Sequence, residues 1–109
     1  MAKLDLRAAA AFLETVPPGH WTSYGDVAIA GGRASNAAQG IVSWIGSNGH
    51  RLHAVHRVLN KDGEIDVGWK PAGPGLPANA AEVRKLLESE GLRFSGARAD
   101  PGRRWRPRA

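Results

Sequence analysis

Apolar residues at helical spacing, together with capping and breaking residues, predict four helices in this chain. The first apolar series starts at Leu6, and its helix is expected to end near Thr15, because Pro-Pro-Gly follows at residues 17–19. The residues of its buried face are three or four positions apart: Leu6, Ala9, Ala10, Leu13 and Val16. This spacing predicts an amphipathic helix.

The next two predicted helices are short and close together. Ser23 can cap the first of them, and Asp26 stands at the reciprocal position of a capping box. That helix is expected to stop at Gly31-Gly32, and Ser35 offers a cap for a second helix that runs to about Gly46. Two short helices joined by a Gly-containing turn are typical of a helix-turn-helix, although other helical hairpins share the pattern.

The second of these helices has one apolar side and one side of small, uncharged residues. The apolar side consists of Ala38, Ile41, Val42 and Ile45. The opposite side consists of Asn36, Gln39, Gly40, Ser43 and Ser47. A helix that only faces water normally carries Lys and Glu, so small residues favour close approach to a sugar-phosphate groove. The alternative is an ordinary solvent-exposed face.

The second half of the chain is less regular. Residues 51–59 are expected to be extended, and Lys-Asp-Gly at 61–63 is typical of a turn. The Pro and Gly content of residues 68–78 predicts a surface loop, with Trp69 and Lys70 as its bulky side chains. Such a loop can be functional or a plain connector.

The last predicted helix runs from its cap Asn79 through Glu90, with Glu82 at the capping-box position and Gly91 as the stop. Its buried stripe consists of Val83, Leu86 and Leu87. Glu90 continues that stripe, so its carboxylate either finds a partner in the interior or bends out to water at the last turn.

Together these elements predict a mainly α, winged helix-turn-helix-like single domain with a short extended segment and a Pro/Gly-rich loop. The length of 109 residues and the hydrophobic content of 42% fit one small core. No apolar run approaches a bilayer span, and the N-terminus lacks the apolar centre of a secretory signal. We therefore expect a soluble, cytoplasmic monomer with no membrane contact.

Charge is distributed unevenly along the chain. Residues 1–90 are formally neutral, so the net charge of +5 lies wholly in residues 91–109, where Trp105 stands among arginines. We therefore divide the chain into a domain at 1–96 and an Arg-rich C-terminal tail at 97–109. The tail suggests contact with a polyanion; the alternative is a solubilising or frayed end.

Composition excludes several kinds of chemistry. The absence of cysteine removes disulfides, thiolate metal sites and thiol nucleophiles. His50, His53 and His56 recur every third residue, but on an extended segment they face alternate sides and no acidic ligand stands beside them. No nucleophile elbow or phosphate-binding Gly loop occurs either. We expect neither a metal site nor another cofactor.

Four short blocks carry a family resemblance. They are GHWTSYGDVA at 19–28, NAAQGI at 36–41, VHRV at 55–58 and ESEG at 88–91. In this order and spacing they resemble the C-terminal domain of alkylguanine-DNA alkyltransferases, over roughly residues 4–95. That resemblance implies a DNA-binding domain.

One departure from the family pattern changes the expected reaction. The family signature is Pro-Cys-His-Arg-Val, whose cysteine accepts the alkyl group from O-alkylated guanine, whereas residues 54–58 read Ala-Val-His-Arg-Val. Valine has no lone pair with which to attack carbon, so we expect no alkyl transfer and no enzyme activity. The chain then resembles the alkyltransferase-like proteins, which bind alkylguanine lesions without repairing them and usually have Trp at this position. Val55 departs from that pattern too.

The resemblance implies roles for individual residues. Tyr24 matches the tyrosine that helps to rotate the target nucleotide. Gln39 matches the arginine that fills the gap in the base stack, if one residue is deleted between Asn48 and Val55. Val55 and Trp69 are expected to line the lesion pocket. The full set of expected DNA-binding residues is Tyr24, Asn36, Gln39, Gly40, Ser43 and Arg51.

A further set of residues is expected to act structurally. His56 and Glu90 match the pair that activates the family's cysteine through a water, Asn48 matches a bracing asparagine, and Arg57 supports the same loop. Without a thiol, we expect these four residues to form a buried polar network that fixes the loop carrying Val55.

We therefore expect a non-enzymatic protein that binds double-stranded DNA containing O-alkylated guanine, flips the damaged nucleotide and flags it for repair-pathway proteins. Two alternatives stay open: a helix-turn-helix DNA-binding module without lesion specificity, and a protein-interaction domain on the same scaffold.

Overall fold

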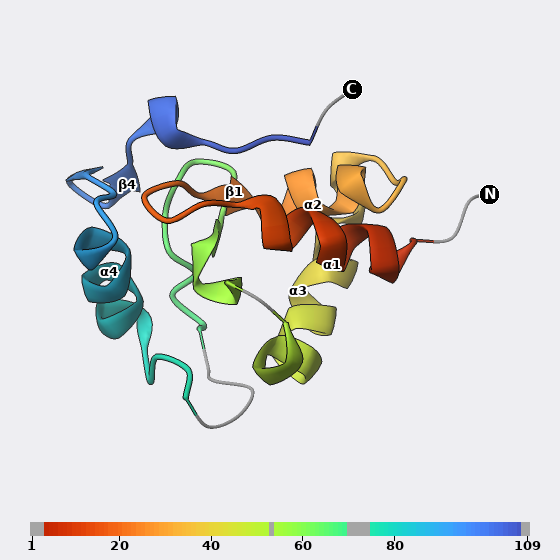
Figure 1. Ribbon diagram of the computed structural model, residues 1–109, viewed down its shortest axis with the longest axis horizontal. Helices are drawn as coiled ribbons and strands as arrows, with labels where there is room; N and C mark the ends of the chain where they lie inside the picture. Colours follow the sequence, from red (N-terminus) through yellow and green to blue (C-terminus); the bar gives the residue numbers. More distant parts are fainter. Residues whose placement is uncertain (1–3, 53, 70–74, 108–109) are drawn as a thin grey trace.

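The computed structural model describes residues 4–52, 54–69 and 75–107. In these ranges it contains four α-helices, several 3₁₀ turns and two two-stranded sheets (Figure 1). None of the helices in the described ranges is both long and apolar enough to cross a bilayer. The mainly α, single-domain fold that the sequence predicts is confirmed.

The elements follow one another in the order α1 (Leu6–Thr15), β1 (Thr22–Ser23), α2 (Tyr24–Ala30), η1 (Ser35–Ala37), α3 (Ala38–Asn48), η2 (Gly49–Arg51), η3 (Val55–Arg57), β2 (Val58–Leu59), α4 (Ala80–Ser89), β3 (Phe94–Ser95), β4 (Arg98–Ala99) and η4 (Pro101–Arg103).

Helices α2 and α3 pack against each other as the helix-turn-helix pattern predicts. The predicted capping box of α2 is present: the Ser23 hydroxyl accepts from the Asp26 amide at 3.0 Å, and the Asp26 carboxylate accepts from the Ser23 amide at 3.2 Å. The helix stops at Gly31, where an added Cβ would lie 2.5 Å from Cδ1 of Leu4. Gly32 follows with φ +84°, a conformation that favours glycine, and the chain turns toward α3.

Two details of this region differ from the sequence prediction. Ser35 does not cap α3, because it begins the separate 3₁₀ turn η1, and α3 starts three residues later without a side-chain cap. Residues 51–59 are not one extended segment: η3 occupies Val55–Arg57, and only Val58–Leu59 is a strand. Ala54, directly before η3, has a φ of 58°, in the left-handed region that residues other than glycine rarely adopt, so the backbone is not extended there.

The described loop residues around the Pro/Gly-rich stretch form no helix or strand, while residues 70–74, including Lys70, lie outside the described ranges. Helix α4 begins after Asn79, whose side chain accepts from the Glu82 amide at 3.0 Å. Gly91 has φ +101° just after the helix, as a C-terminal stop requires. The predicted cap and stop are confirmed, but the helix ends at Ser89, one residue before the predicted Glu90, and the Glu82 carboxylate accepts from the Ala78 amide at 2.7 Å instead of completing a capping box with Asn79.

The core has two clusters of buried side chains that flank the parallel pair β1–β2, in which Thr22 lies opposite Val58. The first cluster belongs mainly to helices α1 to α3 and contains Ala9, Leu13, Tyr24, Val27, Ala28, Ile41, Ile45, Val55 and Val58. The second belongs mainly to α4 and the C-terminal half and contains Trp21, Leu59, Val83, Leu87, Leu92 and Ala99. Trp69 packs against both clusters and so connects them.

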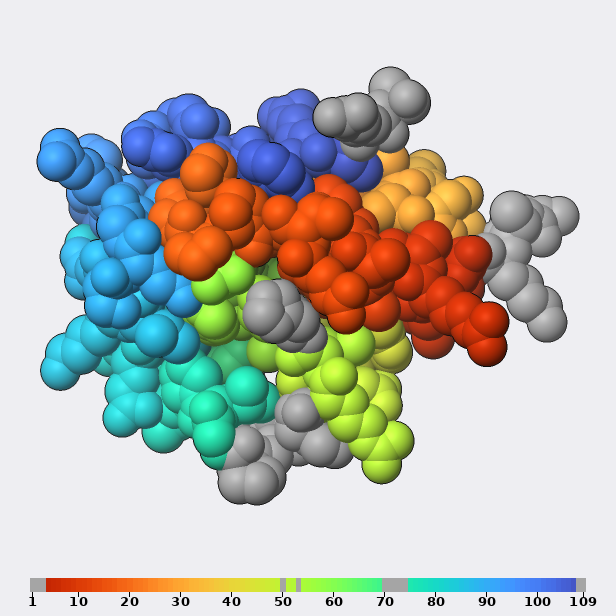
Figure 2. Space-filling view, viewed as in Figure 1, coloured from red at the N-terminus to blue at the C-terminus, as the bar shows by residue number. Residues whose placement is uncertain are grey.

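The C-terminal segment folds back onto the domain. Strands β3 and β4 form an antiparallel hairpin that crosses the predicted boundary between residues 96 and 97. Beyond it, the Trp21 amide donates to the Arg103 carbonyl at 3.1 Å, and the Trp105 amide donates to the Trp21 carbonyl. In the space-filling view, this segment (blue) lies directly against the chain that follows α1 (Figure 2). The separate function of residues 97–109 stays a prediction, but the described part of them is packed.

Arg104 anchors this segment to the start of α2. Its Nε donates to Oδ2 of Asp26 at 2.9 Å, and its Nη2 donates to the Ser23 hydroxyl at 3.0 Å. The guanidinium also lies 5.5 Å from the centre of the Trp21 ring. Because the Asp26 side chain is only 5% exposed, Arg104 provides the charge that a buried carboxylate needs.

We predict that Arg104→Gln lowers the free energy of unfolding by about 2 kcal/mol, because it leaves the Asp26 carboxylate without its charged partner. Urea denaturation followed by circular dichroism measures this loss. Arg103→Gln is the matched control, since the Arg103 side chain is exposed and its backbone carbonyl is unaffected. Equal stability of the two variants would contradict the prediction.

Candidate nucleic-acid interface

A wide groove lies on the face formed by α2, η1 and the first turns of α3. Its volume is about 1070 Å³, and three of the predicted DNA-binding residues line it: Tyr24, Asn36 and Gln39. Residues 60–62 and two C-terminal arginines, Arg104 and Arg106, form other parts of its wall. The groove therefore joins segments that are far apart in the sequence.

The exposed side of the helix-turn-helix is the one that the sequence predicts. Asn36, Gln39, Gly40 and Ser43 are all exposed, whereas Ile41 and Ile45 on the opposite side of α3 are buried. A Cβ added to Gly40 would meet no atom within 4 Å, so the helix backbone is open to close approach there. Arg51 is exposed at the end of η2. Gly40, Ser43 and Arg51 are not among the residues that line the groove.

Tyr24 differs from the other predicted DNA-binding residues because it is only 7% exposed and belongs to the core. Burial, with a smaller contribution from the negative charge of Asp66, raises the pKa of the Tyr24 hydroxyl to about 12. The hydroxyl therefore stays protonated at neutral pH and can donate a hydrogen bond at the groove. Most of the ring serves packing.

The two residues predicted to form a lesion pocket lie in or against the first core cluster. Val55 is 1% exposed, directly after the left-handed Ala54. Trp69 is partly buried, and its indole Nε1 donates to the Pro77 carbonyl at 2.9 Å. Neither residue lines the groove described above.

Three of the four residues predicted to form a polar network meet at one carboxylate. Glu90 accepts from His56 Nε2 at 2.9 Å and from Arg57 through both oxygens, at 3.0 and 2.9 Å. Arg57 Nη1 also donates to the Val16 carbonyl at 2.8 Å, at the end of α1. The side chains of Arg57 and Glu90 are 8% and 15% exposed. Glu90 therefore points inward and has partners in the interior, which is the first of the two alternatives that the sequence left open.

Burial alone would raise the pKa of the Glu90 carboxyl, but the hydrogen bonds from Arg57 and His56, together with their charges, outweigh it and hold this pKa below its usual range. The carboxylate is therefore ionised at neutral pH. The fourth predicted member, Asn48, donates instead to the Trp44 carbonyl at 3.1 Å within its own helix.

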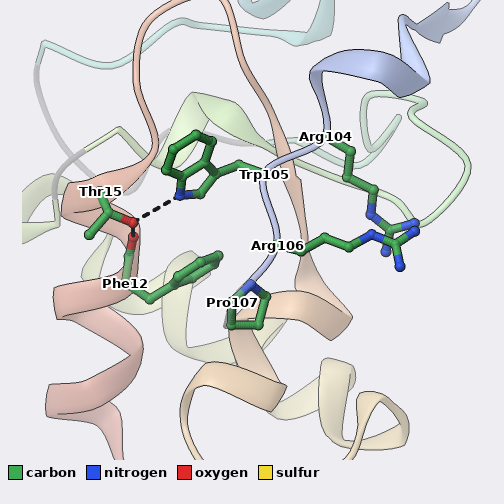
Figure 3. A pocket seen from close by; sticks show the side chains of 6 residues that line it. All are labelled: Phe12, Thr15, Arg104, Trp105, Arg106 and Pro107. Atoms are coloured by element: carbon green, nitrogen blue, oxygen red, sulfur yellow. Dashed lines mark hydrogen bonds between the residues drawn. The ribbon is translucent and has the colours of Figure 1, made fainter. Parts of the chain in front are cut away.

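The sequence predicts polyanion contact by the Arg-rich tail, but it does not indicate that Arg104 and Arg106 line this groove. In the sequence, Arg104 and Arg106 alternate with Trp105 and Pro107. Such alternation is typical of an extended segment with one polar and one apolar side, and it is the signal that could have indicated their direction. Figure 3 shows Trp105 directed toward Thr15, where its Nε1 donates to the hydroxyl at 3.0 Å, while both arginine side chains extend to the other side. A smaller hollow of about 530 Å³ lies between Phe12 and this segment.

Comparisons with known proteins identify a matching family model and a similar fold. The family model described as "6-O-methylguanine DNA methyltransferase, DNA binding domain" matches residues 6–92. The chain is similar in fold to Atl1 of S. pombe, whose crystal structure is of a complex with damaged DNA containing O6-carboxymethylguanine. That likeness has a TM-score of 0.63 and 21% identity, and it covers 97% of this chain and 100% of the other. No curated protein matches the chain in sequence.

We predict that Glu90→Gln lowers the free energy of unfolding at pH 7 by about 3 kcal/mol, because Arg57 then lies buried without its anion. The pKa of Glu90 is lower in the folded protein, so its contribution is present above the ordinary value of 4.5 and is lost as the pH falls through the folded pKa. The stability difference from the unsubstituted protein should therefore shrink progressively as the pH falls below 4.5.

Urea denaturation at a series of pH values measures this difference. Glu88→Gln is the control, since the Glu88 side chain is 48% exposed and its contact with Arg84 is 3.6 Å long. A stability difference for Glu90→Gln that stayed constant down to pH 3 would show that the carboxylate charge is not what Arg57 needs.

Proposed function

Because the chain belongs to the family of the 6-O-methylguanine DNA methyltransferase DNA-binding domain, we propose that it binds double-stranded DNA and recognises alkylated guanine without repairing it. The observation that carries this proposal is the groove, where Tyr24 from α2, Asn36 from η1 and Gln39 from α3 line one surface. These three residues come from the two halves of a helix-turn-helix, so one bound duplex can touch them all.

DNA contact by this face rests on its small residues and open backbone. Gly40 and Ser43 let the sugar-phosphate backbone approach α3 closely, and Asn36 and Gln39 offer amide groups to phosphates and base edges. Arg51, exposed beyond the end of α3, adds a cation for a neighbouring phosphate. The electrostatic part of the affinity comes from such cations.

Lesion recognition is proposed to use nucleotide flipping. Extruding a base costs a few kcal/mol of stacking, and less where alkylation has weakened the base pair. In this proposal the Tyr24 hydroxyl donates to the phosphate of the rotated nucleotide, and Gln39 enters the gap left in the stack. The Atl1 complex supports O6-alkylguanine as the class of lesion.

The extruded base is proposed to enter beside Val55 and Trp69. An aliphatic and an aromatic side chain suit an alkyl group, since each buried methylene contributes about 0.8 kcal/mol. Both side chains are packed in or against the first core cluster, so entry of a base requires the Trp69 side chain to move away from that cluster. Such a movement breaks the hydrogen bond from Trp69 Nε1 to the Pro77 carbonyl and the packing of the indole against both core clusters.

The missing cysteine makes the proposed function recognition rather than repair. The chain contains no cysteine, and the first residue of η3, Val55, carries no nucleophile. The Glu90 carboxylate is held by Arg57 and His56, which suits a structural role. Since the lesion stays on the DNA, we propose that the bound protein marks it for repair proteins.

We predict tighter binding to a duplex that contains one O6-carboxymethylguanine than to the same duplex with guanine. Fluorescence anisotropy titration of both labelled duplexes measures the ratio of dissociation constants, and a tenfold ratio corresponds to 1.4 kcal/mol. Gln39→Ala and Tyr24→Phe should each reduce that ratio severalfold. The phenylalanine keeps the buried ring that an alanine would remove.

The matched control is Ser95→Ala, an exposed polar residue on β3 that does not line the groove. Equal affinity for both duplexes would favour a DNA-binding module without lesion specificity. Absence of duplex binding at moderate salt would favour a protein-interaction domain.

We also predict that the protein gains no mass when it is incubated with alkylated DNA, because no side chain at the position of Val55 can accept the alkyl group. Intact-protein mass spectrometry after incubation measures this directly. A gain equal to one alkyl group would show that another residue, such as His56 or Glu90, acts as a nucleophile.

A further inference from the structure

The C-terminal segment places its arginines and its apolar residues on opposite sides. Trp105 turns toward α1, and Pro107 lies near Phe12, whereas Arg104 and Arg106 extend away from them toward the groove (Figure 3). An extended chain alternates in this way with a period of two residues. The apolar positions hold the segment in place, so the arginine positions have a defined direction.

The two arginines have different surroundings. Arg104 is bound to Asp26 and Ser23, and its charge is already compensated inside the protein. Arg106 is exposed and makes no hydrogen bond or ion pair with any other residue in the described ranges. An arginine of this kind, fixed by its neighbours and without an internal anion, is available for an external one.

The other residues that line the groove indicate which external anion Arg106 can bind. Arg106 lines the same surface as Tyr24 and Gln39, the residues proposed to act on the flipped nucleotide. The groove is lined by three cations, Lys61, Arg104 and Arg106, and by two carboxylates. Of these carboxylates, Asp26 is paired with Arg104, and Asp62 is exposed. A duplex on this face would therefore bring a phosphate of its backbone to the Arg106 side of the groove.

We propose that Arg106 is a DNA phosphate contact and that residues 103–107 are a built edge of the DNA-binding groove rather than a solubilising tail. This inference rests on the proposed DNA binding and extends it. Arg104 acts as the positioning residue, because its ion pair with Asp26 ties the segment to the first turn of α2. Trp105 completes the attachment through Thr15.

The salt dependence of DNA binding tests the proposal. Each phosphate contact releases condensed counterions, so losing one contact reduces the slope of log K against log salt concentration by about 0.9. We expect Arg106→Gln to show this reduction on an undamaged 20-base-pair duplex titrated at several NaCl concentrations, and Arg106→Lys to keep most of the slope. A point substitution is preferable to truncation, because removing residues 97–109 would also remove β4 and the Arg104 ion pair.

Arg98→Gln is the charge-matched control. Arg98 is an exposed arginine of β4, at the end of the molecule away from α2 and α3 (Figure 1), and it does not line the groove. An unchanged slope for Arg98→Gln together with a reduced slope for Arg106→Gln supports the proposal. Equal slopes for the two variants, whether both reduced or both unchanged, would overturn it.

The unsubstituted protein separates failure of this inference from failure of the proposed function. If it binds the duplex with a normal salt dependence and only the Arg106 effect is absent, DNA binding stands and the C-terminal contact is wrong. If it does not bind the duplex at low salt, both proposals fail. Thermal melting of each variant confirms that the fold is intact, as expected for exposed side chains.

Discussion

The arrangement of this domain depends on one bidentate ion pair, between Arg57 and Glu90. Arg57 also donates to the carbonyl of Val16, directly after α1, and His56 donates to the Glu90 carboxylate. The end of α1, the turn η3 and the end of α4 therefore meet at one point. A buried charge without its partner is costly, so these segments have few alternative arrangements. The turn that carries Val55 is fixed as a consequence, and β2 follows it directly and pairs with β1.

A second ion pair, between Arg104 and Asp26, lies at the other end of the β1–β2 pair. Strand β1 leads straight into α2, whose capping box shares the Asp26 carboxylate with Arg104. The start of the helix-turn-helix is thus held between the core and the C-terminal segment. This connection gives the arginines near the C-terminus a structural role as well as an electrostatic one, since one of them completes the fold and the next faces the groove.

The residues around Glu90 also bear on the proposed recognition of DNA without repair. The resemblance in sequence implies that His56 and Glu90 match the pair that assists the family's cysteine. In this chain Arg57 engages both oxygens of the Glu90 carboxylate, and the pKa of Glu90 is lowered. A low pKa stabilises the anion as a permanent ion-pair partner. The network therefore fixes the turn at Val55, where the proposed function places the extruded base.

Local sequence determined the helices, because their signals act over a few residues: the Ser23–Asp26 capping box, the Asn79 cap and the stops at Gly31 and Gly91 all lie where the sequence predicts. The small-residue face of α3 and the inward direction of Glu90 were also readable from helical periodicity. The sequence did not predict the left-handed conformation of Ala54, because alanine rarely adopts it. The nearby contacts of Arg57 with Glu90 and Val16 join distant segments and form only in the folded chain. The sequence also did not predict the packing of the Arg-rich end. The partners of Arg104 and Trp105 lie about 80 and 90 residues earlier in the chain, and contacts over such separations are decided only when the chain is folded.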